Sequence, residues 1–264
     1  MKTSMKFVFV GIAMLIATQY LITSTYAKID PQTIVGIWLL DEGKGEVAKD
    51  TSGNGNDGKV VGAEWVKGKI GMALAFDASN QLEIPASAGT DNYVDGFTYL
   101  LSVMPTGSPP NDNTRVMERD WHNPAIQIGA ADFYGSTVIA GDQAASNVRG
   151  GKWAKEEWSF VALTWDGSVL SLYVNDEMVK DIKLKKPDFS KNFNSGAIWL
   201  ARWKGGAGWD FIGVIDEVAV FSVAVNPDDL KSIMADGLDK TLGLSQVSTE
   251  GKLTATWGDV KSKL

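Results

Sequence analysis

The stretch Ile215-Asp216-Glu217-Val218-Ala219-Val220-Phe221 decides the fold, because it is an apolar strand that carries two acids. Side chains of a strand alternate between its two faces. Asp216 is therefore predicted to share one face with four apolar residues, and Glu217 to share the other face with three. The first set is Ile212, Val214, Val218 and Val220, and the second is Ile215, Ala219 and Phe221. If the first face is buried, Asp216 is a buried acid that needs a partner.

Two explanations of Asp216 are possible. No Lys or Arg lies within the strand 212–221, and an unpaired buried carboxylate costs several kcal/mol, so a bound cation is one answer. The alternative is that Asp216 lies at the edge of the strand or accepts hydrogen bonds from loop amides.

A short helix is predicted directly after this strand, over residues 227–235. Asn226 is a favourable N-cap, Pro227 occupies the first helical position, and Gly237 follows the end. Asp228 and Asp229 place negative charge in the first turn, where it stabilises a helix.

Upstream of the helix, short apolar runs alternate with Gly, Asn, Asp and Pro, which is typical of an all-β sandwich. The clearest unit has strands at 158–165, 169–174 and 178–184, joined by Asp166-Gly167 and Asn175-Asp176, and predicts an antiparallel meander. More than ten predicted strands imply two packed sheets. The other predicted strands are 34–40, 59–61, 72–76, 81–84, 97–103, 114–119, 125–128, 137–140, 197–203, 212–221 and, beyond the helix, 253–257.

The N-terminal residues 1–27 have the form of a secretory signal. Lys2 and Lys6 precede an apolar run over 7–17, and Thr25-Tyr26-Ala27 offers small residues for cleavage. A retained membrane anchor is the alternative, but polar residues interrupt this run. We expect a secreted, periplasmic or surface-attached bacterial protein with one domain over 28–238 and a C-terminal tail over 239–264.

The amino-acid composition excludes several classes of function. The chain has no Cys, which excludes disulfides, thiol catalysis and thiolate zinc sites. Its net charge of −7 becomes about −9 when the two signal lysines are removed. We therefore expect neither nucleic acid nor an anionic membrane as a partner, and we expect a monomer that is not inserted in a membrane after cleavage.

Four pieces of the sequence together resemble a known family. They are the segments 35–45, 50–58 and 68–77, and the strand 212–221 with its trailing helix. In this order they resemble the laminin-G-like (LamG) branch of the concanavalin A-like lectin and glucanase superfamily. The resemblance implies a two-sheet antiparallel jelly-roll sandwich with one short C-terminal helix.

The resemblance also implies a structural calcium ion between the N- and C-terminal parts. Glycines in the segment 50–58 permit unusual backbone angles, so this loop and Asp216 together can offer hard oxygen ligands. The predicted ligands are Asp50, Asn56, Asp57 and Asp216. The alternative is that the loop only forms tight Asx turns.

Catalytic patterns are missing from the sequence. Glycosidases of this superfamily carry paired acids on one strand face, whereas Glu118-Arg119-Asp120 lacks a third acid and Glu156-Glu157 point to opposite faces. His122 is the sole histidine and is expected in a surface turn. No nucleophile elbow, phosphate loop or dinucleotide fingerprint occurs. We therefore predict that the protein is not an enzyme.

The ten Trp residues point to a ligand. Sugars stack on aromatic rings while their hydroxyls meet polar groups. The Trp residues within apolar runs are predicted to lie in the core, namely Trp38, Trp158, Trp165 and Trp199. The predicted ligand-binding residues are Trp121, Trp203, Trp209, Arg202 and Asp210. The alternative is that loop aromatics only plug the ends of the sandwich.

We predict a non-catalytic module that recognises carbohydrate or glycosylated surfaces. An adhesive or structural protein-binding domain is the main alternative, and a polysaccharide-active enzyme is the third. An exposed ring with convergent polar groups favours sugar, whereas a wide apolar patch favours protein.

Overall fold

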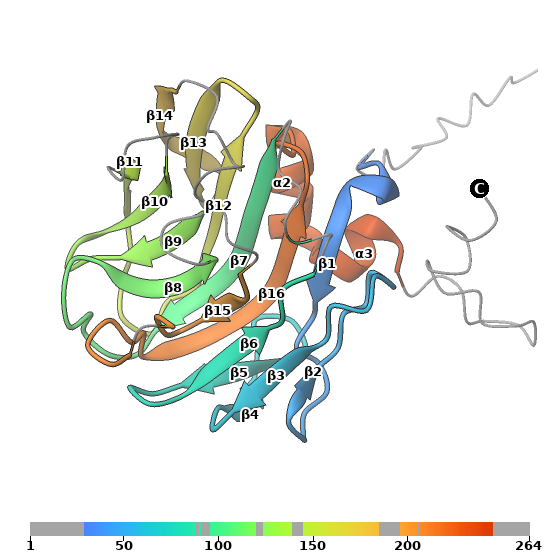
Figure 1. The fold of residues 1–264 in the computed structure, drawn as a ribbon, viewed down its shortest axis with the longest axis vertical. Helices are drawn as coiled ribbons and strands as arrows, with labels where there is room; N and C mark the ends of the chain where they lie inside the picture. Colours follow the sequence, from blue (N-terminus) through green and yellow to red (C-terminus); the bar gives the residue numbers. More distant parts are fainter. Residues whose placement is uncertain are drawn as a thin grey trace, which may run out of the picture.

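The computed structural model describes residues 29–87, 90, 96–119, 124–138, 145–184, 196–204 and 206–244. These residues form a sandwich of two antiparallel sheets with eight strands each (Figure 1). The predicted all-β jelly-roll architecture is therefore confirmed. The signal segment 1–27 and the strand at 253–257 lie outside the described residues and stay predictions.

Each sheet combines strands that lie far apart in the sequence. Sheet A has the order β14 (Glu177–Lys183), β13 (Val169–Val174), β12 (Ser159–Trp165), β7 (Phe97–Pro105), β16 (Gly213–Phe221), β5 (Met72–Phe76) and β4 (Glu64–Lys67), and β1 (Ile34–Trp38) also pairs with β16. Sheet B has the order β11 (Ala145–Lys152), β10 (Asp132–Val138), β9 (Ala125–Ile128), β8 (Thr114–Arg119), β15 (Ile198–Leu200), β6 (Gln81–Ile84), β3 (Gly58–Val61) and β2 (Val47–Ala48). The helical elements are η1 (Pro31–Thr33), α2 (Pro227–Asp236) and α3 (Leu238–Leu242).

The predicted meander is present as β12, β13 and β14, and its turns have the expected chemistry. The carboxylate of Asp166 accepts hydrogen bonds from the amides of Ser168 at 2.9 Å and Val169 at 2.7 Å. Asn175 has a φ of 56°, in the left-handed region that Asn tolerates. Local turn signals were therefore sufficient to place these three strands.

Three strands and two short helical elements were not predicted. They are β2, β4, β11, η1 and α3, and β10 occupies 132–138 instead of 137–140. β2 has two residues and α3 has five. β4 and β11 form the outer edges of their sheets. An edge strand is covered on fewer sides, so its sequence carries a weaker apolar pattern.

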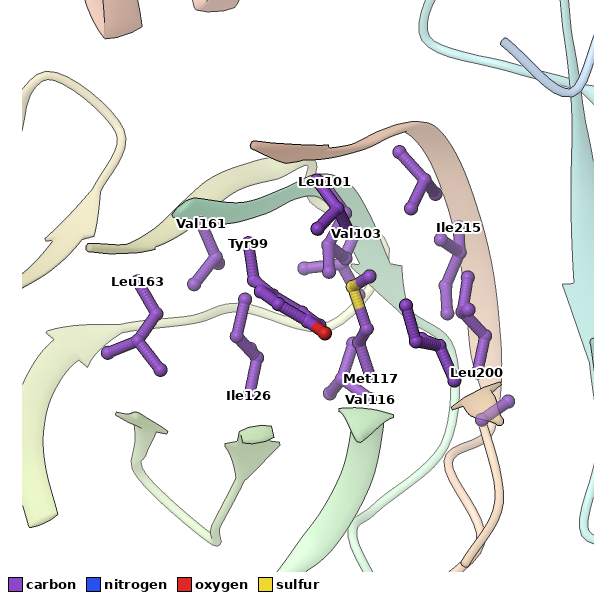
Figure 2. Packing of buried hydrophobic residues seen from close by; sticks show 14 of the residues in the cluster. Tyr99, Leu101, Val103, Val116, Met117, Ile126, Val161, Leu163, Leu200 and Ile215 are labelled. Atoms are coloured by element: carbon purple, nitrogen blue, oxygen red, sulfur yellow. The ribbon is translucent and has the colours of Figure 1, made fainter. Parts of the chain in front are cut away.

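One core fills the space between the sheets. Figure 2 shows Tyr99 and Leu101 of β7 and Leu163 of β12 pointing toward Ile126 of β9 and Met117 of β8. All five side chains are completely buried. The alternation of apolar residues along both sheets produces this layer.

A second apolar layer covers the outer face of sheet A. Leu100 of β7 and Phe160 of β12 pack there with Leu230 and Ile233 of α2, and Figure 1 shows α2 beside β7 and β16. Leu238 of α3 joins the same cluster. The strands β7, β12 and β16 are consequently buried on both faces, which explains their nearly continuous apolar sequences. No helix in the described part of the chain is long and apolar enough to span a membrane.

A β-bulge in β16 overturns the predicted faces of that strand. Asp216 pairs with Ser102 and Ala219 with Leu100, so β16 has one extra residue between these pairs, and Glu217 has a φ of 52°. Beyond the bulge, the alternation is shifted by one residue. Val218 therefore points into the sandwich core, whereas Asp216 lies on the outer face of sheet A with Ala219 and Phe221.

Candidate functional site

The segment 201–211 between β15 and β16 forms a closed loop, called here the 201–211 loop. It begins at Ala201, whose φ of 66° turns the chain sharply. The amide of Phe211 donates to the carbonyl of Ala201 at 2.7 Å and closes the base, and the amide of Gly206 donates to the carbonyl of Trp203 at 3.1 Å. Gly205 lies outside the described residues.

Three hydrogen bonds fix this loop to neighbouring segments. The amide of Arg115 in β8 donates to the carbonyl of Trp209 at 2.8 Å. The side-chain amide of Asn111 donates to the carbonyl of Gly208 at 2.5 Å, and the guanidinium of Arg202 donates to the carbonyl of Ser79 at 3.1 Å. Supported from several sides, the loop holds its side chains in defined positions, as a binding site requires.

Two tryptophans of the loop contact each other. The ring centroids of Trp203 and Trp209 lie 5.0 Å apart with an angle of 74° between the ring planes. This edge-to-face arrangement is favourable for aromatic pairs. Both residues are half-buried, so the pair presents aromatic surface to the solvent. The indole Nε1 of Trp203 is buried and has no hydrogen-bond partner among the residues that the structure describes.

A charged pair lies in the same loop. The Nε atom of Arg202 is 3.6 Å from Oδ1 of Asp210, and Oδ2 of Asp210 accepts a hydrogen bond from the amide of Gly208 at 3.0 Å. Asp210 is 4 % exposed, whereas the side chain of Arg202 is 23 % exposed. The loop therefore places the partly exposed guanidinium of Arg202 next in sequence to the aromatic pair, and the buried carboxylate of Asp210 lies against this guanidinium.

Four of the five predicted ligand-binding residues are thus brought together. They are Arg202, Trp203, Trp209 and Asp210. The fifth, Trp121, lies outside the described residues, as does His122. Their roles stay predictions.

The predicted core tryptophans divide into two groups. Trp38 and Trp165 are completely buried as predicted, and the indole of Trp38 donates to the carbonyl of Asn56 at 2.8 Å. The prediction was wrong for Trp158 and Trp199, which are half-buried. The run 197–203 looked like a buried strand, but β15 has only three residues, and Trp199 lies on the face opposite to its core neighbours Ile198 and Leu200.

A buried polar network adjoins the 201–211 loop on β8. A bulge between Arg115 and Met117 brings Arg115 and Glu118 onto one face, and the Arg115 Nε donates to Glu118 Oε2 at 2.9 Å. The Arg115 guanidinium also donates to Gln127 at 3.2 Å, and Gln127 donates to Ser136 at 3.0 Å. The network connects β8, β9 and β10. The regular alternation of side chains along a strand does not predict this network, because it places residues three apart on opposite faces.

Asp216 is bound by the backbone in the structure. It is completely buried, and its carboxylate accepts hydrogen bonds from the amides of Ile70 at 3.0 Å and Glu217 at 2.8 Å. Burial is the main cause that raises the pKa of Asp216 to about 7. Of the two interpretations of this acid, hydrogen bonding to loop amides is the one observed.

Glu217 and Lys69 complete this polar cluster. Glu217 accepts a hydrogen bond from the amide of Leu238, and burial raises its pKa to about 7. The ammonium of Lys69 lies 3.4 Å from the carbonyl of Met234 and 3.5 Å from the hydroxyl of Ser102. Burial lowers the pKa of Lys69, while the charges of Asp216 and Glu217 act in the opposite direction.

The other three predicted calcium ligands organise the loop at 50–58. Asp50 accepts hydrogen bonds from the amides of Ile37, Ser52 and Asn56. Asp57 accepts bonds from the amide of Asp50 at 2.9 Å and from the ammonium of Lys49 at 2.6 Å. These bonds form turns of the Asx type and attach the loop to β1.

The four residues do not fit one calcium ion in this arrangement. The carboxylates of Asp50, Asp57 and Asp216 already accept backbone hydrogen bonds, and Asp216 is bound to a different loop. Calcium needs six to eight oxygen ligands. Among the described residues, no group of three or more acids or histidines is placed to hold a metal ion. Calcium binding therefore stays a prediction that this geometry does not support.

Comparisons with known proteins agree with the fold. A family model described as the concanavalin A-like lectin/glucanases superfamily matches residues 76–231. No curated protein matches the sequence significantly.

Solved structures with the same fold include several binding domains. The binding domain of Paraclostridial Mosquitocidal Protein 1 superposes with a TM-score of 0.63 at 13 % identity, over 77 % of this chain and 52 % of that one. The botulinum neurotoxin DC binding domain in complex with rat synaptotagmin II gives 0.60 at 13 % identity, over 79 % and 53 %. Domain 4 of the extracellular arabinanase AbnA from Geobacillus stearothermophilus gives 0.53 at 15 % identity, over 76 % and 98 %. This chain thus spans about half the length of the first two, and identities this low show the fold alone.

Proposed function

Because the chain belongs to the concanavalin A-like lectin/glucanase superfamily, we propose that it is a non-catalytic module that binds carbohydrate through the 201–211 loop. One observation carries this proposal. The half-buried rings of Trp203 and Trp209 lie in contact, beside the Arg202–Asp210 pair. A sugar uses such a combination, because its C–H face stacks on a ring while its hydroxyls bond to charged side chains.

The exposed apolar residues favour sugar over a protein partner. Among the described residues, the exposed large apolar side chains are Val47, Val61 and Met178. Val47 and Val61 lie on β2 and β3 of sheet B, whereas Met178 lies on β14 of sheet A. An adhesive protein-binding surface needs a contiguous apolar patch, and these three positions do not supply one.

A structural precedent and the state of Glu118 support the same proposal. The arabinanase domain with this fold was solved in complex with arabinotriose. Glu118, the first acid of the Glu-x-Asp motif, is ion-paired with Arg115, and both side chains are almost fully buried. Because its side chain is only 2 % exposed and is held by Arg115, Glu118 offers little carboxylate surface to a substrate.

We also propose that the protein is exported and acts outside the cytoplasm. The basic and apolar composition of residues 1–27 supports this. Intact-mass measurement of the protein isolated from its native host is expected to give a chain that begins at Lys28. A chain that retains residues 1–27 would contradict export by a cleaved signal.

A glycan array with the mature protein tests carbohydrate binding. We expect at least one glycan to bind, and Trp203→Ala or Trp209→Ala to weaken that binding by about thirtyfold, which corresponds to about 2 kcal/mol. Trp65→Ala is the matched control, because Trp65 is a half-buried tryptophan on β4, the far edge of sheet A. Thermal melts confirm that each variant is folded. The absence of any glycan signal, or equal binding by both loop variants and the native protein, would contradict the proposal.

A further inference from the structure

A row of side chains crosses four neighbouring strands of sheet B. Lys59 of β3 pairs with Glu83 of β6, Glu83 pairs with Trp199 of β15, and Trp199 pairs with Glu118 of β8. Residues directly opposite each other in antiparallel strands share a face of the sheet. Because Ile198 and Leu200 point into the core, the whole row lies on the outer face of sheet B.

Three members of this row are available to a ligand. Lys59 is exposed, and Glu83 and Trp199 are half-buried. Within the described part of the chain, the ammonium of Lys59, the carboxylate of Glu83 and the indole N–H of Trp199 have no hydrogen-bond or ion-pair partner. Glu118 differs, because it is bonded to Arg115.

The row continues the 201–211 loop. Trp199 lies two residues before Ala201, at which the loop begins. At the other side, the loop residue Arg202 donates to the carbonyl of Ser79, two residues before β6. The loop therefore borders the row in two places, at the end of β15 and at the segment before β6, and these two strands are paired.

The chemistry of the row suits a sugar ring. Neighbouring strands lie about 4.8 Å apart, so the row from Lys59 to Trp199 extends over about 10 Å. An indole offers a surface for the C–H face of a sugar, and a free carboxylate and ammonium beside it accept from and donate to hydroxyl groups. Protein interfaces are instead depleted of Lys and Glu, which are two of the three members of this row.

We propose that Trp199, Glu83 and Lys59 form a second sugar-binding position, so that the module binds a linear polysaccharide along its length rather than a single terminal sugar. The chain of sugars runs from the 201–211 loop onto the outer face of sheet B. This inference rests on the proposed function of the loop. It assigns to Trp199 a role in binding that its sequence context did not indicate.

Affinity measured against oligosaccharide length tests the inference. The probes are a short and a long oligomer of the polysaccharide that scores on the array, measured by isothermal titration calorimetry. For the native protein we expect the long oligomer to bind at least tenfold more tightly than the short one. Trp199→Ala should remove this gain while leaving the affinity for the short oligomer unchanged, and Glu83→Gln should reduce the gain partly.

Two further variants separate binding from folding. Trp199→Phe keeps an aromatic face and should retain part of the gain. Trp158→Ala, at a half-buried tryptophan that precedes β12 of sheet A, should retain all of it. Melting temperatures of all variants are compared with that of the native protein.

The outcomes separate the two proposals. If no glycan binds, the function proposed for the loop fails. If glycans bind through Trp203 and Trp209 but affinity does not rise with length, or the rise survives Trp199→Ala, the second position is overturned and the first stands. Equal weakening of short and long oligomers by Trp199→Ala also overturns the second position.

Discussion

At Glu217 the backbone enters the left-handed region, which is strained for a residue with a side chain. The strain coincides with a polar contact, because the Glu217 carboxylate accepts the amide of Leu238 at the start of α3. The same bulge turns Asp216 toward Ile70. The two acids of the bulge thus link β16 to the segment before β5, through Asp216, and to α3, through Glu217.

The pair of buried acids predicts a characteristic dependence of stability on pH. The pKa values of Asp216 and Glu217 are raised to about 7, whereas in the unfolded chain they return to about 4. Between these values the folded chain holds more protons, so the free energy of unfolding falls as pH rises. The contribution is complete below pH 4 and is lost as pH passes through about 7.

Glu217→Gln isolates this effect. Gln still accepts the amide of Leu238 but does not titrate, so the decline in stability between pH 5 and pH 8 should become about half as steep. Urea unfolding at several pH values measures it. Acids with lowered pKa values, such as Asp57 and Asp166, lose their contribution only at lower pH and do not disturb this window. An unchanged slope in the variant would contradict the assignment.

The sequence indicated the acid but not its surroundings. The apolar residues on both sides of Asp216 predict its burial, and hydrogen bonding to backbone amides is one of the two explanations that its residue type allows. The bulge was not visible, because one extra residue shifts the alternation without leaving a signal in the residue types. A second bulge, in β8, likewise made the Arg115–Glu118 pair unpredictable. The bulge in β16 is the reason why Asp216 was predicted on the wrong face of its strand.

At the scale of elements, α2 was the most predictable part of the chain. Its N-cap, first residue and following glycine are as expected, and the Asn226 side chain accepts the amide of Asp229 at 3.0 Å. Capping depends on residues within one turn, so the sequence contains the whole signal. The strands at 72–76, 81–84, 114–119 and 125–128 were placed equally well.

Loss of the N-cap is expected to cost about 1 kcal/mol of stability. Asn226→Ala removes the bond to Asp229 and exposes the end of α2, which covers sheet A. Lys231→Ala, at an exposed position of the same helix, is the control and should change stability by less than about 0.5 kcal/mol. Chemical denaturation of both variants measures the difference. Equal stability of the two would show that the cap contributes nothing.

The loop at 50–58 tests the calcium prediction. Since its carboxylates are bonded to backbone amides, we expect the melting temperature to be the same in excess calcium and in excess chelator. A calcium ion bound only by the folded chain would instead add about 2.7 kcal/mol at a concentration one hundred times its dissociation constant. A higher melting temperature in calcium, lost in Asp50→Asn, would reverse the conclusion drawn from the geometry.

At the scale of the molecule, the sheets share one core, and neither has another way to bury its inner face. Leu101 lies in the middle of this core (Figure 2). Leu101→Ala should destabilise the fold by about 3 kcal/mol, whereas Met178→Ala at a 49 % exposed position should have little effect. Circular dichroism and tryptophan fluorescence should report the same transition in denaturant. Separate transitions would mean that the sheets unfold independently.

The fold class could be predicted from the sequence because it depends on the number of strands and on the spacing of the turns. A single misplaced strand does not change either of them. Only part of the candidate site could be predicted from the sequence. Arg202, Trp203, Trp209 and Asp210 are close in sequence and lie in one loop, and their role in binding stays a prediction. The row from Lys59 through Glu83 to Trp199 joins three strands through pairing that no local pattern specifies.

The two described ends of the chain lie on the same side of the molecule. Ile29 and Leu244 both pack against the apolar cluster beneath α2 and α3, on the outer face of sheet A, whereas the sugar positions proposed on Trp199, Glu83 and Lys59 occupy the outer face of sheet B. A segment or domain joined to either of these ends would therefore be attached on the side of sheet A, opposite to the outer face of sheet B. Tethered to a surface or to a larger protein, the module would present sheet B outward, free to meet a polymer approaching from the surroundings.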